Sequence, residues 1–144
     1  MNAAEQAKNF EVASQIATVI NLLKSQFPDA RVDMKPWMND PCTQELVDPD
    51  SIDLGFHFPG FSRSFQSRSV LIQIRFHHDR LDNAYRAIGI EATGYSHKGQ
   101  QWRFSTVENW HFEGETQPNP DTASKLKHFC RQTLALFNRG DRTA

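Results

Sequence analysis

The sequence predicts a single α+β domain spanning residues 1–144. The expected architecture is a two-layer sandwich: an antiparallel meander sheet of four to five strands, with N- and C-terminal helices packed on one face. Two observations predict it. Apolar and polar residues alternate through residues 51–113, the period of half-buried antiparallel strands. Before and after that stretch, apolar residues recur at three- and four-residue steps, the period of amphipathic helices.

The first predicted helix covers residues 3–27. Asn2 and Glu5 have the spacing of a capping box, in which each side chain satisfies a free backbone amide. Pro28 ends the helix because its ring disfavours helical geometry at the residue before it. The apolar stripe consists of Val12, Ile16, Val19, Ile20, Leu23 and Phe27.

A short strand around Arg31 to Lys35 and a proline-containing loop up to residue 50 precede the main strands. Four strands then follow, and their core-facing residues share even numbers. These residues are Ile52, Leu54, Phe56 and Phe58; Val70, Ile72, Ile74 and Phe76; Ile88, Ile90 and Ala92; and Trp102, Phe104, Trp110 and Phe112.

Two irregularities are expected in this pattern. The last strand loses its alternation at Thr106 to Glu108, which predicts a bulge. Even numbering on both sides of Gly99 requires a turn of odd length, so we expect three residues there with Gly99 left-handed.

The second predicted helix covers residues 120–138. Asn119 can cap it, Pro120 suits its first position, and Gly140 suits the residue after its end. Its apolar face, which includes Cys130, needs a partner. The even-numbered sheet face is the only apolar surface that remains for both helices, which places them in one layer.

Composition excludes several classes of protein. The net charge is −1 and the pI is about 6.6, so no global field favours nucleic acid or an anionic membrane. No apolar run approaches the ~20 residues that span a bilayer. The polar N-terminus lacks the features of a secretory signal, and two separated cysteines suit a reducing compartment. We therefore expect a cytoplasmic protein without membrane contact, metal or cofactor.

Ionisable side chains gather on the odd-numbered sheet face. The candidate ligand- or partner-binding residues are His57, Arg75, His77, Glu91, Arg103 and His111. Gly55, Ala87, Gly89 and Ser105 share this face and predict a shallow groove. The plainer interpretation is a solvated face, which any half-buried sheet presents. Zinc binding would require the three histidines to converge, and their spacing gives no support for that.

Three functions are compatible with this surface. The first is a non-catalytic binding or assembly module that uses the odd-numbered face and nearby loops to bind a protein partner, with a homodimer as one form. The second is a small enzyme or ligand-binding protein with a polar pocket on the sheet; no residue is assigned as catalytic. The third is a single-stranded nucleic-acid binder, suggested by Phe61 and Phe65 beside Arg63 and Arg68. We favour the first and do not expect nucleic acid.

Overall fold

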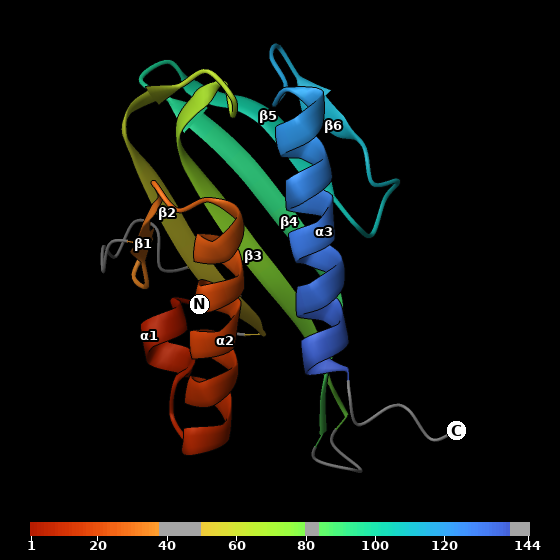
Figure 1. Ribbon diagram of the computed structural model, residues 1–144. Coiled ribbons are helices and arrows are strands. Elements are labelled where there is room, and N and C mark those ends of the chain that lie inside the picture. The colour runs from red at the N-terminus through yellow and green to blue at the C-terminus, as the bar shows by residue number, and fades with distance from the viewer. Residues whose placement is uncertain (38–49, 80–83, 139–144) are drawn as a thin grey trace.

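The computed structural model describes residues 1–37, 50–79 and 84–138, without the side chains of residues 78, 79, 84 and 85 (Figure 1). Its elements in chain order are α1 (Ala3–Gln6), α2 (Phe10–Gln26), β1 (Arg31–Asp33), β2 (Ser51–Ser62), β3 (Ser67–Asp79), β4 (Ala84–Ser96), β5 (Gly99–Ser105), β6 (Phe112–Gly114) and α3 (Pro120–Phe137).

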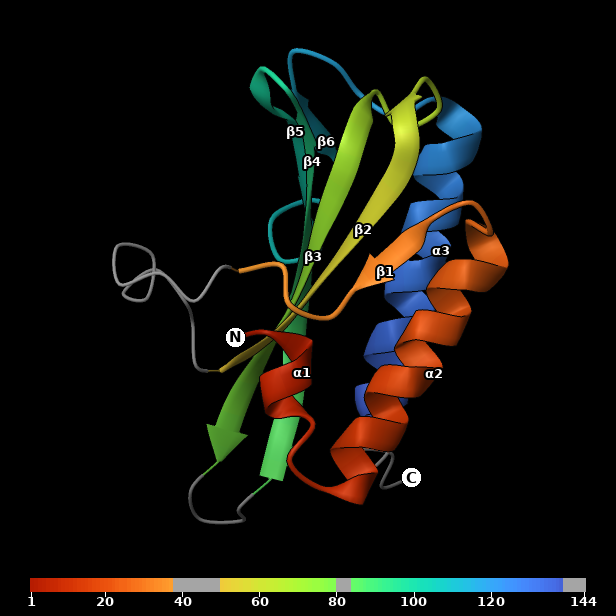
Figure 2. The ribbon, with the colours of Figure 1, turned by 90° about the vertical axis from the view of Figure 1, so that its left-hand side faces the viewer.

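The six strands form one antiparallel sheet in the order β1-β2-β3-β4-β5-β6. Helices α2 and α3 lie side by side against the same face of this sheet (Figure 2). The predicted α+β architecture with both helices on one face is confirmed. The sheet has six strands where four to five were expected, because the short strands β1 and β6 extend its two edges.

The even-numbered side chains of the central strands form the core beneath the helices. Leu54, Phe56, Ile72 and Phe104 are each at most 1% exposed. The buried Trp102 indole donates a hydrogen bond to the Phe65 carbonyl at 2.6 Å. The helices contribute the buried side chains of Ile16, Val19, Leu23, Leu126, Phe129 and Cys130. Burial raises the pKa of Cys130 to about 12, so this thiol is a core side chain.

The N-terminal helix is divided where one helix over residues 3–27 was expected. The chain leaves helical geometry after α1, and Asn9 starts α2 by accepting a hydrogen bond from the Val12 amide at 2.9 Å. Asn2 does not form the predicted capping box. Its Oδ1 accepts from the Trp37 amide at 2.9 Å, so it ties α1 to the segment that follows β1.

The prediction that Ile88 faces the core is wrong. The ladder between β3 and β4 shifts after Arg75, which pairs with Gly89, whereas Phe76 pairs with Ala87. Ile88 is the additional residue of this bulge and is 55% exposed, whereas Ala87 is buried. On the N-terminal side of the bulge, the odd-numbered Ala87 of β4 therefore faces the helices.

The bulged edge of β4 is closed by a side chain from α3. Asn138, the residue that caps the C-terminus of α3, accepts a hydrogen bond from the Ala87 amide at 3.0 Å through Oδ1. Its Nδ2 donates to the Ala87 carbonyl at 3.0 Å. The carboxamide therefore satisfies both backbone groups of Ala87, as a neighbouring strand would.

The turn between β4 and β5 has two residues between the paired Ser96 and Gly99, where three were expected. The extra residue that keeps the even-numbered side chains of both strands on the core face lies in β5, after the turn. Tyr95 pairs with Gln100 and Gly94 pairs with Trp102, so Gln101 is the extra residue. Gly99 has the expected positive φ, +103°.

Residues 102–112 do not form one bulged strand. The chain turns over residues 106–109 and returns as β6, which pairs with β5 through Phe104 and Phe112. Trp110 takes a positive φ of +60° after this turn, and the Arg131 guanidinium lies 5.2 Å from its ring centroid. The loss of alternation at Thr106 to Glu108 thus marks a reversal of the chain.

The start of α3 is as predicted: Asn119 accepts a hydrogen bond from the Thr122 amide at 2.8 Å, and Pro120 occupies the first helical position. Gly140 and Cys42 lie outside the described residues. Within the described ranges, none of the helices combines the length and apolar character needed to cross a membrane.

Candidate functional site

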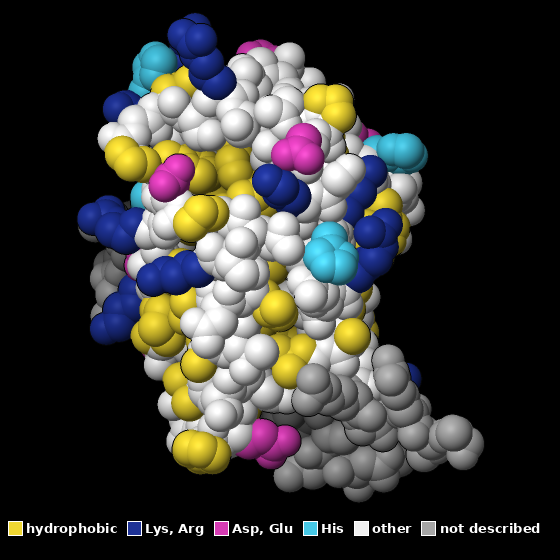
Figure 3. All heavy atoms as spheres, in the orientation of Figure 1, with side chains coloured by type: hydrophobic (Ala, Val, Ile, Leu, Met, Phe, Trp, Pro, Cys, Tyr) yellow, Lys and Arg dark blue, Asp and Glu magenta, His cyan; other side chains and the backbone are white. Residues whose placement is uncertain are grey.

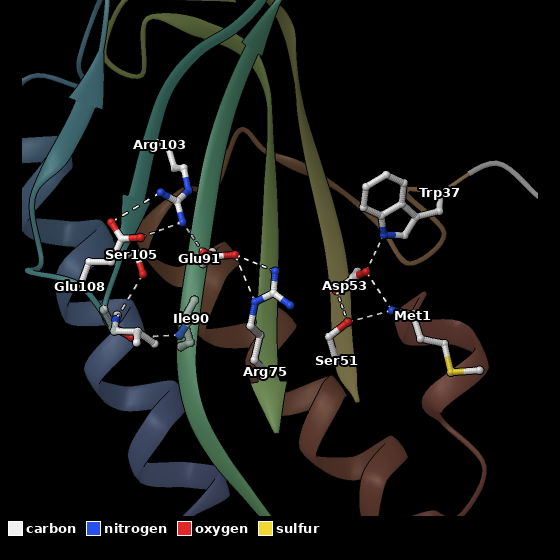
Figure 4. A network of polar contacts seen from close by, with 12 residues as sticks. Met1, Trp37, Ser51, Asp53, Arg75, Ile90, Glu91, Arg103, Ser105 and Glu108 are labelled. Carbon is white, nitrogen blue, oxygen red and sulfur yellow. Dashed lines mark hydrogen bonds and ion pairs between the residues drawn. The ribbon is translucent and has the colours of Figure 1, made fainter. Parts of the chain in front are cut away.

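The sheet face opposite α2 and α3, here called the outer face, carries a row of four charged side chains (Figure 4). Both the Arg75 Nε and Nη2 donate to Glu91 Oε2, at 3.1 and 2.8 Å. Arg103 Nη2 donates to Glu91 Oε1 at 2.5 Å and to Glu108 Oε1 at 3.2 Å. We call Arg75, Glu91, Arg103 and Glu108 the charge row.

Strand register explains why these residues meet. Arg75 of β3 pairs with Gly89, two residues before Glu91 on β4. Arg103 of β5 pairs with Thr93, two residues after Glu91. The two arginines are therefore diagonal neighbours of Glu91 on opposite sides, at a spacing of ~7–8 Å that long side chains can bridge.

Glu108 completes the charge row from the turn between β5 and β6. A continuous strand would have placed this residue in the core, which is why a bulge was expected here, and the structure has a turn over residues 106–109 instead. Its side chain is 50% exposed and pairs with Arg103. The loss of alternation at this position was the signal in the sequence, because a glutamate on a core parity indicates that the chain has left the strand.

The charge row is electrostatically balanced, with two arginines and two glutamates. Burial acts to raise the pKa of Glu91, but hydrogen bonds from Arg75 and Arg103 and their charges outweigh it, so the pKa lies below its ordinary value. Hydrogen bonds to Glu91 and Glu108 raise the pKa of Arg103. The Glu91 carboxylate and the Arg103 guanidinium are thus held in their charged forms at neutral pH.

Two exposed aliphatic side chains border the charge row. Ile88 is 55% exposed beside Gly89, and Val107, next to Glu108, is 62% exposed. Val107 covers Gly89, since a Cβ added at Gly89 would lie 2.1 Å from the Val107 Cγ2. We call Ile88 and Val107 the aliphatic pair. These two side chains place exposed apolar area next to the ordered charges of the row.

A second polar cluster lies at the β2 edge of the outer face. Asp53 is fully buried although its parity predicts exposure. Its carboxylate accepts hydrogen bonds from the Trp37 indole at 2.5 Å and the Ser51 hydroxyl at 2.8 Å, and it pairs with the Met1 amino group at 2.9 Å. This cluster fastens the segment after β1 over β2, so it serves the fold.

The shallow groove expected from small residues is filled. Val107 covers Gly89, and a Cβ on Gly55 would lie 3.4 Å from the Pro36 Cβ. Ala87 faces the core, and Ser105 is buried with its hydroxyl accepting a hydrogen bond from the Val107 amide at 3.2 Å. The outer face at these positions is therefore covered by neighbouring side chains.

The predicted histidines are not bonded to the charge row: among the described residues, no hydrogen bond or ion pair joins His57, His77 or His111 to it, although His77 lies two residues from Arg75 on β3. His57 of β2 contacts Asp33, with Nε2 3.4 Å from Oδ2. It pairs with Ser69 of β3, eight residues from His77, which is about 26 Å along a strand at ~3.3 Å per residue. His111 is exposed before β6. Of the six predicted residues, Arg75, Glu91 and Arg103 are the three that hydrogen bonds join in the described part of the chain.

Metal binding has no support in the described part of the chain, where no three His, Cys, Asp or Glu residues are arranged to hold an ion. The residues proposed for stacking on nucleic-acid bases also separate. Phe65 is buried in the core, in edge-to-face contact with Phe27 and Phe56, whereas Phe61 is 52% exposed.

Comparison with known proteins gives one result. No curated protein and no solved structure matches the chain. The profile of a protein family described as a domain of unknown function matches residues 4–139, which is nearly the whole chain. The chain belongs to this family.

Proposed function

We propose that this protein is a non-catalytic binding or assembly module that docks a protein partner on its outer face. The observation that carries the proposal is the charge row lying beside the aliphatic pair. Protein interfaces combine exposed apolar side chains with ordered polar groups, and arginine is enriched in them. Arg75, Arg103 and Glu108 are between 34% and 50% exposed, so a partner can reach them.

The bonding within the charge row favours docking over catalysis. A catalytic group needs a free proton-donating or proton-accepting site directed at a substrate. Here both Glu91 oxygens accept hydrogen bonds from arginines of the same chain, and its pKa is lowered, so it stays ionised. A small enzyme with a pocket at these residues is therefore a weaker proposal.

Nucleic-acid binding is also weaker. A binder of phosphate backbones presents unbalanced positive charge. In the charge row each arginine contacts a glutamate, and only Phe61 of the two proposed stacking residues is exposed. Protein docking is also compatible with the cytoplasmic location that we propose, for which the free buried thiol of Cys130 is the support.

A photo-crosslinking amino acid at position 88 tests the proposal. We expect it to yield a discrete protein adduct in cells, identified by mass spectrometry. The same amino acid at position 128, where His128 is exposed on α3, serves as the control for the helical side. The adduct from position 88 should disappear when Arg75→Glu and Arg103→Glu are added. No adduct from position 88, or the same adduct from both positions, would refute docking on the outer face.

A further inference from the structure

We infer that the partner on the outer face is a second copy of this chain, related by a two-fold axis that passes between Glu91 and Arg103. This inference rests on the proposed function and names its partner. It comes from the order of charges in the charge row. From β3 towards the turn after β5, the signs are plus, minus, plus, minus for Arg75, Glu91, Arg103 and Glu108.

An alternating row with an even number of charges is complementary to its own reverse, because reversal places each charge opposite a charge of the other sign. A two-fold axis that lies in the interface, parallel to the sheet and perpendicular to the row, turns the second outer face towards the first and reverses the row, so Arg75 faces Glu108 of that copy. Glu91 then faces the Arg103 of the second copy. Every charge meets its opposite, and the same contacts repeat on both sides of the axis, as in an isologous dimer.

This alternation also discriminates between partners. The charge row has no net charge, so it gives no long-range attraction to a uniformly acidic or basic surface. A partner needs the same alternation in the opposite direction, and a second copy supplies it without further assumption. The aliphatic pair beside the row adds apolar area, because Ile88 and Val107 are 55% and 62% exposed in one copy.

Charge reversals that preserve this pairing test the inference. Arg75→Glu and Glu108→Arg each place two like-charge contacts in a homodimer, so each protein alone should associate at least about tenfold more weakly than wild type. When the two variants are mixed, every pair across the axis is again of opposite sign. Sedimentation velocity should then recover the dimer, at twice the 16.5 kDa mass of the chain.

A matched control distinguishes the effect of the proposed register on association from the effect of net charge. Arg103→Glu changes the net charge of the row by the same amount as Arg75→Glu. When Arg103→Glu is mixed with Glu108→Arg, however, Glu91 of the second protein faces the glutamate introduced at position 103 of the first. Arg75 of the first protein then faces the arginine introduced at position 108 of the second. This second mixture should associate less than the first. Equal association of both mixtures would overturn the proposed register.

A cross-linking measurement covers the case in which a charge reversal prevents folding. Arg75→Cys and Glu108→Cys proteins, both in a Cys42→Ser background, are mixed with a short bis-maleimide. A dimer joined between positions 75 and 108 is expected from the mixture and not from either protein alone. A wild-type protein that remains at 16.5 kDa, while position 88 still gives an adduct with another protein, would overturn the second copy and leave the proposed function standing.

Discussion

Val107 lies directly over Gly89, so that its Cγ2 occupies the space that a side chain at position 89 would need. A Cβ at position 89 would lie 2.1 Å from this methyl carbon, well inside van der Waals contact. The turn between β5 and β6 can rest on the outer face only because position 89 has no side chain.

Gly89→Ala should therefore lower the free energy of unfolding by about 1–3 kcal/mol, the usual cost of overpacking. Urea unfolding measures the change. Gly60→Ala is the matched control, because no atom lies within 4 Å of a Cβ there, and we expect a change within about 0.5 kcal/mol. Adding Val107→Ala should recover most of the loss at Gly89. An equal effect of Gly89→Ala and Gly60→Ala would show that Val107 does not pack there.

Glu91→Gln should lower stability most at neutral pH and least in acid. The folded-state pKa of Glu91 lies below the unfolded value, so ionised Glu91 stabilises the fold above the ordinary pKa of about 4.3. That contribution to stability is lost as the pH falls from about 4.3 through the lowered pKa of Glu91 in the folded state.

Urea unfolding at several pH values measures this difference. At pH 7 we expect wild type to exceed Glu91→Gln by about 1–3 kcal/mol, because two charge-assisted hydrogen bonds weaken. Glu113→Gln, which changes an exposed carboxylate on β6, should show a difference within about 0.5 kcal/mol at pH 7. A Glu91→Gln difference that stays constant down to pH 2 would contradict the pairing in the charge row.

Asn138→Ala should expose the open edge of β4. Both backbone groups of the buried Ala87 lose their partner, which costs about 1–3 kcal/mol. Amide hydrogen exchange at Ala87 should accelerate with the loss. Asn21→Ala, at an exposed position on α2, should leave stability within about 0.5 kcal/mol. Unchanged exchange at Ala87 would show that the Asn138 carboxamide does not close this edge.

Side-chain parity predicted the layers of this fold correctly. The alternation around Ile72 and Phe104 placed their side chains beneath the helices, because a half-buried strand repeats every two residues. The same parity failed at Ile88, since a bulge of one residue inverts it and leaves no mark in the local composition. The loss of alternation at Thr106 to Glu108 was wrongly interpreted as a bulge within one strand, because the chain turns there and returns as β6, although Trp110 still packs against the core.

The candidate site was predictable only in part. Arg75, Glu91 and Arg103 could be placed on one face from their odd numbers, but their contacts depend on strand register, which parity alone does not determine. Glu108 was missed because it reaches the row from a turn. Asp53 was on the expected face, yet Trp37 covers it from a segment distant in sequence.

Sedimentation velocity on wild type and on an Ile88→Asp, Val107→Asp variant tests most directly whether the outer face binds a second copy. Both side chains are more than half exposed in one copy, so the changes should leave folding intact, which circular dichroism can check. With increasing concentration, wild type should approach twice 16.5 kDa, and the variant should remain at 16.5 kDa. Identical sedimentation of the two folded proteins at every concentration would contradict the account.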